Sequence, residues 1–307
     1  YLPDSTFVPV KSPGFDKVGY FEANPLLLKD GSSRIYAMKW NEKKPIQFAI
    51  SANTPKKYRE LIKNAVLYFN KILPEKNITV IQLVDLSITA PHPDYNIIQW
   101  ADWNSAGYAF ADAHVDPRSG EVTHAQVFFP SAFTDANVLR RFRLYNGALE
   151  FDGLNSGQNK KVFQVGLKGF SKNRLCQRNL FKDLNKIMSL NADGEISPEA
   201  AEKAVNDYVY EVIAHEVGHV LGLRHNFAGN LHSNYDGKDR KALALSYYKN
   251  MKAPEGVVTS SSVMEYSRFE ESSWNGDILQ QQNAKPLAYD EMAIKYLYVD
   301  QNLPENR

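Results

Sequence analysis

Three histidines and a glutamate within residues 215–225 have the spacing of a metal site. The segment reads His215-Glu216-Val217-Gly218-His219-Val220-Leu221-Gly222-Leu223-Arg224-His225. On an α-helix, His215 and His219 leave the same face, so both imidazoles can reach one cation. Three protein nitrogens around Zn²⁺ leave a fourth position for water, whose pKa the metal lowers to about 7. We therefore expect His215, His219 and His225 to bind zinc and Glu216 to be a general base for hydrolysis.

A glycine between the second and third histidines has a mechanical purpose. To bring a third ligand back to the metal, the chain must leave the helix abruptly, usually through a left-handed residue. Glycine adopts that conformation without strain. The sequence therefore predicts Gly222 as the first residue beyond the helix and His225 as the returning ligand. The alternative is an amphipathic helix whose histidines pack or form hydrogen bonds without any metal.

Length and composition set the class of protein. The 307 residues are 43% hydrophobic and 12% aromatic, enough for a sizeable core in one large domain or two lobes. A formal net charge of +1 provides no basic field and favours neither nucleic acid nor an anionic membrane as a partner. Apolar runs stay below the roughly 18 residues of a membrane span, and residues 1–10 do not resemble a signal peptide. We expect a mature or trimmed form from which any targeting information is absent.

A single cysteine, Cys176, excludes an internal disulfide framework. Its thiolate could occupy the open position on zinc as an inhibitory latch. The other interpretation is a buried small hydrophobic residue.

The elements that must position the site begin with a proline- and glycine-rich segment, residues 1–44, which we expect to wrap around the domain as short strands and turns. A hairpin is predicted around residues 30–33. Thr54 and Pro55 have the residue types of an N-cap and first helical position, for a helix continuing to Ile72. Predicted strands flank this helix: Ile46–Ile50, Ile78–Val84 and Asn96–Trp100. This order predicts a mixed sheet backed by a helix.

Two further extended runs, Ala106–Val115 and Val122–Phe129, are separated by a turn sequence. If the first forms the edge of the sheet, an extended protein or peptide substrate can pair along the strand near Gly107 to Val115. His114 and His124 lie in these runs, and we interpret them as hairpin residues rather than ligands, because the metal already has three.

The site helix is predicted over about residues 198–221. Ser197 provides an N-cap and Pro198 a proline at the first helical position. Val205, Val209, Val212 and Val220 form an apolar stripe that anchors the ligands on a rigid element. Upstream, Val138–Leu144 and Leu180–Leu190 are the best helical candidates, with a helix-breaking loop at 191–195. Downstream, His232 is interpreted as a solvated loop residue.

The segment Ser262-Val263-Met264-Glu265-Tyr266 resembles the Met-turn of the metzincins, zinc peptidases whose H-E-x-x-H-x-x-G-x-x-H signature is matched without departure. The resemblance implies that Met264 forms a hydrophobic floor beneath the zinc. It also implies that the phenol of Tyr266 approaches the metal or stabilises the oxyanion. Tyr266 could instead pack beside the site without a catalytic role.

The quoted motifs resemble a poorly characterised bacterial family of extracytoplasmic zinc-dependent metalloproteases over roughly residues 40–300. The motifs are Pro45-Ile46, Tyr58 to Lys63, Val115 to Glu121, His215 to Phe227, Ser262 to Phe269 and Tyr289-Asp290. The resemblance implies an α+β metzincin-like zincin with a twisted mixed sheet and backing helix, a long active-site helix, and a smaller C-terminal lobe with the Met-turn and a final helix. We expect a wrapping segment at 1–44, an N-terminal catalytic lobe at 45–222 and a C-terminal lobe at 223–307.

The leading hypothesis is a secreted, periplasmic or surface zinc endopeptidase, in which Glu216 activates the attacking water and Tyr266 donates to the oxyanion. A catalytically silent or suppressed zinc-binding structural or adhesion module is the alternative, although an intact Glu216 is not needed for a purely structural site. A third interpretation is an enzyme restricted to one short substrate, such as a wall peptide or its own chain.

Overall fold

The computed structural model describes residues 5–12, 19–73, 77–103, 108–134, 178–179 and 196–299. Cys176, the helices expected at Val138–Leu144 and Leu180–Leu190 and the loop expected at 191–195 lie outside the described residues. Those four predictions therefore stay predictions.

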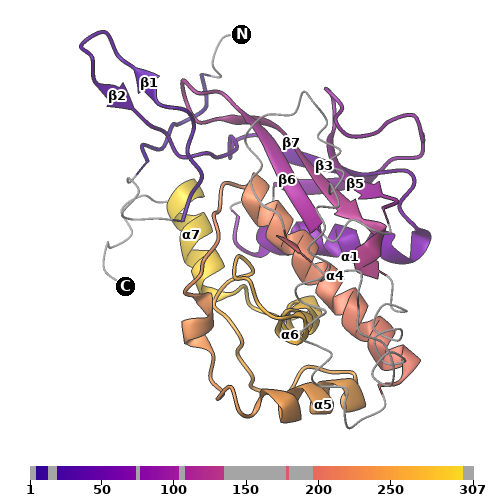
Figure 1. The fold of residues 1–307 in the computed structure, drawn as a ribbon. Helices are drawn as coiled ribbons and strands as arrows, with labels where there is room; N and C mark the ends of the chain where they lie inside the picture. The colour runs from indigo at the N-terminus through magenta and orange to yellow at the C-terminus, as the bar shows by residue number, and fades with distance from the viewer. Residues whose placement is uncertain are drawn as a thin grey trace, which may run out of the picture.

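A mixed sheet forms the upper layer of the molecule (Figure 1). Its strands are β3 (Ile46–Ile50), β4 (Ile78–Gln82), β5 (Asn96–Ala101), β6 (Tyr108–Val115), β7 (Val122–Pro130) and β8 (Arg178–Asn179). Their order is β4-β3-β5-β7-β6-β8. Strands β4, β3, β5 and β7 are parallel, whereas β6 runs antiparallel to β7 and to β8. The expected mixed sheet is confirmed, with the second strand ending at Gln82 rather than Val84.

The two faces of the sheet bury different sets of side chains. Along β3, Phe48 and Ile50 face the main core, while Ala49 belongs to a small cluster with Leu83 and Ile97 on the opposite face. This alternation is what a strand with both faces covered requires. On β6 the fully buried residues of the main core are three alanines, and the strand packs against helix α4. Small side chains there let the helix approach the strand closely. These alanines are Ala109, Ala111 and Ala113.

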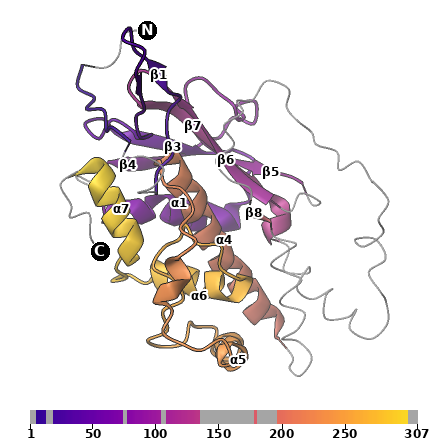
Figure 2. The same ribbon diagram turned by 60° about the vertical axis from the view of Figure 1, so that its left-hand side comes forward.

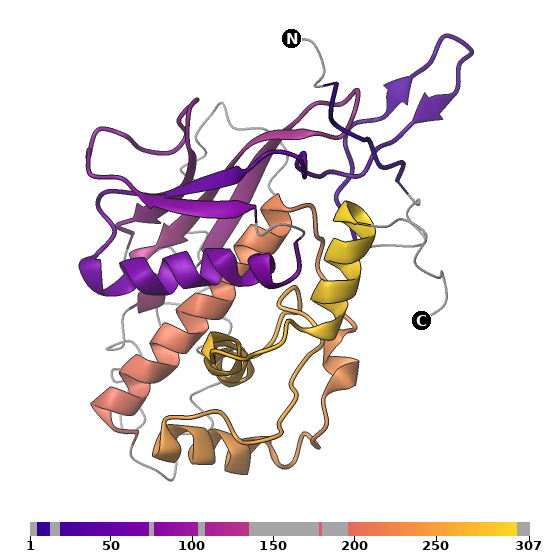
Figure 3. The same ribbon diagram turned by 180° about the vertical axis from the view of Figure 1, so that it is seen from behind.

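Helix α1 (Lys56–Val66) lies against the core side of the sheet and packs on α4 (Figure 3). It buries Tyr58, Ile62, Ala65 and Val66, as its helical spacing predicts. Its start differs from the expectation by one residue, because Pro55 is the N-cap and Thr54 bonds the Ser51 hydroxyl at 3.0 Å instead of capping. Its end differs too, since residues 67–71 continue as a 3₁₀ helix.

The long active-site helix is confirmed as α4 (Pro198–Val220). Ser197 is its N-cap, and the Ser197 hydroxyl accepts a hydrogen bond from the Ala200 amide at 3.1 Å. The helix is buried on all sides from Ala204 to Val220 apart from partial exposure at Asn206. A helix enclosed in this way holds its side chains in fixed positions, which a metal site needs.

Three helices follow α4 below the sheet (Figure 2): α5 (Arg240–Asn250), α6 (Phe269–Gln280) and α7 (Ala288–Tyr298). Helix α6 packs along α4, with the Phe269 ring centroid 4.7 Å from that of Tyr208. The final helix was expected at about this place and is confirmed. Helices α5 and α6 were not expected, because their sequences are rich in polar residues and show no clear apolar period.

The N-terminal segment carries a hairpin of β1 (Leu26–Leu27) and β2 (Ser33–Arg34), which projects from the body of the molecule (Figure 1). Before it, the chain runs beside the end of α4. The Phe21 amide donates to the Gly222 carbonyl at 2.8 Å, and the Arg224 amide donates to the Gly19 carbonyl at 2.7 Å. The segment is therefore bonded directly to the chain that returns the third histidine. The expected division at residues 44/45 and 222/223 stays a prediction.

Candidate metal centre

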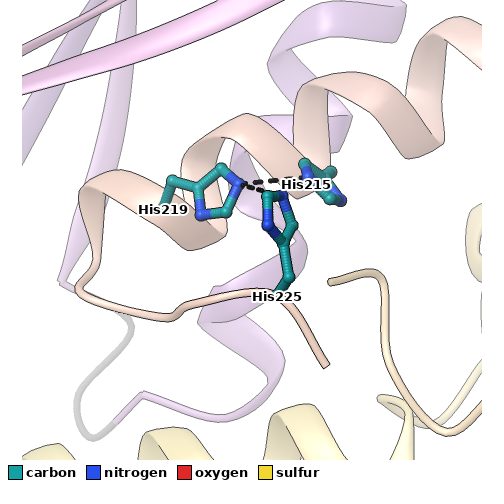
Figure 4. Close-up of side chains that lie close together, drawn as sticks. All are labelled: His215, His219 and His225. Atoms are coloured by element: carbon teal, nitrogen blue, oxygen red, sulfur yellow. Dashed lines mark hydrogen bonds between the residues drawn. The ribbon is translucent and has the colours of Figure 1, made fainter. Parts of the chain in front are cut away.

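Three imidazoles converge at the carboxyl end of α4 (Figure 4). The Nε2 atom of His219 lies 3.1 Å from Nε2 of His215 and 3.2 Å from Nε2 of His225. Within the described ranges these three residues are the one group of histidine, cysteine and carboxylate side chains whose ligand atoms cluster closely enough to hold a metal ion. The sequence-predicted ligand set is therefore brought together in space.

The tautomers of two ligands are fixed by backbone carbonyls. Nδ1 of His215 lies 2.6 Å from the Val263 carbonyl oxygen, and Nδ1 of His219 lies 2.8 Å from the Leu223 carbonyl oxygen. A carbonyl can only accept, so each Nδ1 carries the proton and donates it. Each Nε2 then presents a lone pair toward the shared point. This is the orientation of metal-binding histidine.

The donor set fits a tetrahedral zinc ion. With Nδ1 protonated, neither Nε2 of the pair His215 and His219 can donate to the other, so both lone pairs are available to a shared cation. Zn–N distances of about 2.0–2.1 Å in a tetrahedron place two ligand nitrogens about 3.3 Å apart. The separations of 3.1 and 3.2 Å are close to that value. Zinc is the cofactor that these residues are placed to bind.

The end of α4 has the geometry that returns His225 to the site. Gly222 has φ +104°, the Gly222 amide donates to the His219 carbonyl at 2.9 Å, and the Leu223 amide donates to the Gly218 carbonyl at 3.0 Å. These two bonds form a Schellman motif. A Cβ on Gly222 would also lie 2.1 Å from the Met38 carbonyl oxygen. The expected role of Gly222 is confirmed, and the close approach adds a second reason for glycine.

The last carbonyls of α4 are satisfied by residues distant in sequence. The Trp40 indole N–H donates to the Val220 carbonyl at 2.8 Å, and the Tyr298 hydroxyl donates to the Leu221 carbonyl at 2.8 Å. The Trp40 amide in turn donates to the Tyr298 hydroxyl at 3.2 Å. Helix ends leave such carbonyls without partners inside the helix. Here the N-terminal segment and α7 both stabilise the helix end that carries the ligands.

Met264 lies buried directly against α4. Its side chain is so close to Gly218 that a Cβ there would lie 2.4 Å from the Met264 Sδ. The Met264 carbonyl also accepts from the Asn226 amide at 3.0 Å, one residue after the third ligand. The methionine thus packs against the same turn of helix that carries His215 and His219.

A buried aspartate on α7 holds the Met-turn in place. The Asp290 carboxylate accepts from the Ser262 hydroxyl at 2.5 Å, the Val263 amide at 3.0 Å and the Tyr68 hydroxyl at 2.9 Å. Val263 is the residue whose carbonyl fixes His215. Burial raises the pKa of Asp290 to about 6, although the three hydrogen bonds favour its ionised form. One carboxylate therefore connects α7 and the 3₁₀ turn after α1 to the first metal ligand.

The two residues expected to take part in catalysis lie beside the triad. Glu216 is fully buried next to His215 on α4. The Tyr266 ring lies over the ligands, with its centroid 4.2 Å from that of His225 and 5.9 Å from that of His215.

Two site residues were not foreseen. The Phe21 ring centroid lies 5.5 Å from that of His219, although Phe21 is far away in sequence. No local pattern marks Phe21. Asp290 belongs to the Tyr289-Asp290 motif of the family resemblance, but the sequence did not predict its role. An acidic residue in the first turn of a helix is common and does not indicate that three buried donors bind it. Both assignments depend on long-range packing.

The remaining histidines lie elsewhere. His114 and His124 are direct partners across β6 and β7, with ring centroids 5.9 Å apart, so their interpretation as strand residues is confirmed. His232 is exposed in the short 3₁₀ turn Gly229–His232, in agreement with a solvated position.

The strand expected to bind substrate is not an uninterrupted edge. Strand β8 pairs with Tyr108 and Ala109 of β6. Gly107 lies outside the described residues. Within the described ranges no further strand borders β6 on that side beyond Ala109. Strand β8 therefore occupies the start of the strand that was expected to bind substrate.

Comparison with protein families found one match. Residues 197–306 match the model of a family described as Met-zincin. Comparisons with curated proteins and with solved structures found no match. The matched segment begins at the N-cap of α4 and includes the triad, the Met-turn and α7.

The family match and the fold define the class of protein. The match over residues 197–306 supports a metzincin-clan zinc metalloprotease, and the recognition made from the signature and the Met-turn is confirmed. The α+β architecture, with its mixed sheet and long helix, agrees with that class. No helix in the described part of the chain is long and apolar enough to cross a membrane.

Proposed function

We propose that the protein is a zinc-dependent endopeptidase in which His215, His219 and His225 bind the metal and Glu216 is the general base. The convergence of three Nε2 atoms at the end of a buried helix carries this proposal. The Met-zincin match of residues 197–306 supports the same class of chemistry.

Each side chain of the site has a separate role in the proposed reaction. Glu216 takes a proton from the attacking water and later delivers it to the leaving amine. Zinc, when bound, polarises the scissile carbonyl and acidifies water. Tyr266 donates a hydrogen bond to the developing oxyanion, a role supported by the position of its ring over His225. Glu216 is fully buried and directly follows the first ligand on α4, which supports this role.

We also propose that the substrate is an extended protein or peptide that pairs with β6 between Ala111 and Val115. Antiparallel pairing at a strand edge positions a peptide through its main chain and leaves its side chains to determine specificity. Strand β6 packs on α4, which supports its nearness to the ligand-bearing helix. An extracytoplasmic location is part of the same proposal.

The test compares wild type with Glu216→Ala. We expect both proteins to bind one zinc ion per chain, and cleavage of a mixed peptide library to fall at least about a hundredfold in the variant. Zinc content by elemental analysis and product detection by mass spectrometry give the two readouts. If wild type bound zinc but left every peptide intact, the alternative of a zinc-binding structural or adhesion module would replace the proposal.

A further inference from the structure

Two aromatic side chains beside the third ligand are exposed, in contrast to most large aromatics of the described chain. Phe227 is 69% exposed and Tyr266 is 41% exposed. We propose that these two rings form an aromatic shelf that selects substrates with a large apolar side chain next to the scissile bond. This inference rests on the proposed peptidase function and adds the class of substrate.

The shelf is continuous with the metal centre. Ring centroids are 5.8 Å apart between Phe227 and Tyr266, 5.5 Å apart between His225 and Phe227, and 4.2 Å apart between His225 and Tyr266. All three rings are therefore in mutual contact. A peptide advances about 3.3 Å per residue when extended, so a bond held at the metal places a flanking side chain within reach of the shelf.

The backbone that carries the shelf is held rigidly. The Asn226 amide donates to the Met264 carbonyl at 3.0 Å, and the Ser261 amide donates to the Gly229 carbonyl at 3.0 Å. The Glu265 carboxylate accepts from the amides of Asn230 at 3.1 Å and Tyr266 at 2.9 Å. These bonds join the loop after the third ligand to the Met-turn. An aromatic surface prepared in this way loses little entropy when a ligand covers it.

The chemistry of the shelf favours apolar and aromatic side chains. Aromatic rings bury large areas and prefer offset or edge-to-face contact with other rings. The shelf presents ring faces and edges rather than charge, so an alanine or an aspartate in the same position would gain far less. A selectivity of about tenfold or more over alanine is the scale that such a contact provides.

Binding tests the shelf without relying on turnover. Phenylalanine hydroxamate and alanine hydroxamate share a zinc-binding group and differ only in the side chain. On zinc-loaded wild type we expect the phenylalanine compound to bind at least about tenfold tighter by calorimetry. Phe227→Ala should bring the ratio close to one and leave zinc content and alanine hydroxamate affinity unchanged. Phe227→Leu should keep an intermediate ratio.

Leu27→Ala is the matched control, because Leu27 is 77% exposed on the projecting β1 and β2 hairpin. It should leave both affinities unchanged. The shelf is refuted if wild type binds the two hydroxamates equally, or if Phe227→Ala weakens both to the same extent. The second result would mean that Phe227 only supports Tyr266.

Peptide cleavage separates this inference from the proposed function. Peptides that differ only in phenylalanine or alanine at one position flanking the cut should show the same ratio in kcat/KM. Cleavage without any preference would overturn the shelf and leave the peptidase proposal intact. Selective hydroxamate binding without cleavage of any peptide would support the shelf and overturn the peptidase proposal.

Discussion

Two groups of three histidines lie in different parts of this molecule, and only one is built to bind metal. The first is His215, His219 and His225; the second is His92, His114 and His124. In the first group the Nε2 atoms converge, and two of the rings donate Nδ1–H to backbone carbonyls. In the second, His114 and His124 face one another across two strands with ring centroids 5.9 Å apart.

The difference lies in what surrounds each ring. Nε2 of His124 is buried and lacks a hydrogen-bond partner, and the Nδ1 of His92 accepts from the Asp94 amide at 3.2 Å. An accepting Nδ1 places the ring proton on Nε2 instead, the opposite tautomer from the first group. Neighbouring histidines therefore form a metal site when a hydrogen bond from the other ring nitrogen fixes the tautomer and the orientation of each imidazole.

The largest effect is expected from removing a ligand. His219→Ala should weaken zinc binding by more than about a hundredfold. Losing only a residue that hydrogen-bonds a metal ligand already lowers metal affinity by about 10- to 100-fold, and His219 is itself a predicted ligand. The double variant His114→Ala with His124→Ala should keep one zinc ion per chain. Competition with a zinc-responsive dye measures both. A loss of zinc from the double variant would show that the second group also binds metal.

The next effect comes from Asp290, which supports the first group indirectly. Asp290→Ala leaves the Ser262 hydroxyl, the Val263 amide and the Tyr68 hydroxyl without their acceptor. We expect the free energy of unfolding to fall by about 2–4 kcal/mol and zinc affinity to fall about tenfold. Denaturant unfolding and dye competition give the two values. Glu291→Gln, next in sequence, removes only a solvent-screened ion pair with Lys295, so it should leave zinc affinity unchanged and lower the free energy of unfolding by less than about 1 kcal/mol.

Gly222 gives a smaller effect with a clear internal control. Gly222→Ala places a methyl group against the Met38 carbonyl at a residue with φ +104°. Backbone strain alone costs about 1–3 kcal/mol, and the collision adds to it. Gly31 has φ +82° and open space around it, so Gly31→Ala should show the strain alone. Equal loss of stability in the two variants would mean that the Met38 contact adjusts freely.

The smallest effect on stability is expected from the protonation of His124 in the second group of histidines. Burial, with the charges of His114 and His92 adding to it, lowers the pKa of His124. The unfolded chain therefore binds this proton at higher pH, and the free energy of unfolding falls as pH drops below about 6.5. His124→Gln should reduce this fall by less than about 1 kcal/mol, since the ring is only half-buried. If the pH profile of unfolding were the same in His124→Gln and wild type, the lowered pKa of His124 would not be the cause of the pH dependence.

The metal ligands could be predicted from sequence because their spacing is local. His215 and His219 lie one helical turn apart, and Gly222 stands where the helix must end, so the signature itself encodes the geometry. Strand β3 and helix α4 were equally clear, since each has a continuous apolar pattern. Helix α6 was missed because its buried residues include Ser272, Ser273 and Asn275, and such polar residues leave no apolar period.

The supporting contacts could not be predicted for a different reason. Phe21 beside His219 and Asp290 behind Val263 are specified by the tertiary fold, and neither has a sequence signal of its own. The pairing of β8 with the start of β6 is likewise a contact between distant segments. Such interactions depend on how distant parts of the chain pack together.

The bond between Tyr68 and Asp290 joins residues 222 positions apart, and the bond between Tyr20 and Ala293 joins residues 273 positions apart. Contacts at such separation require large loops to close and slow the folding of a chain. One of these contacts supports the imidazole cluster, because Asp290 on α7 accepts from the amide of Val263, whose carbonyl fixes His215. We therefore expect a chain that lacks α7 to hold the three imidazoles less firmly and to bind zinc less tightly.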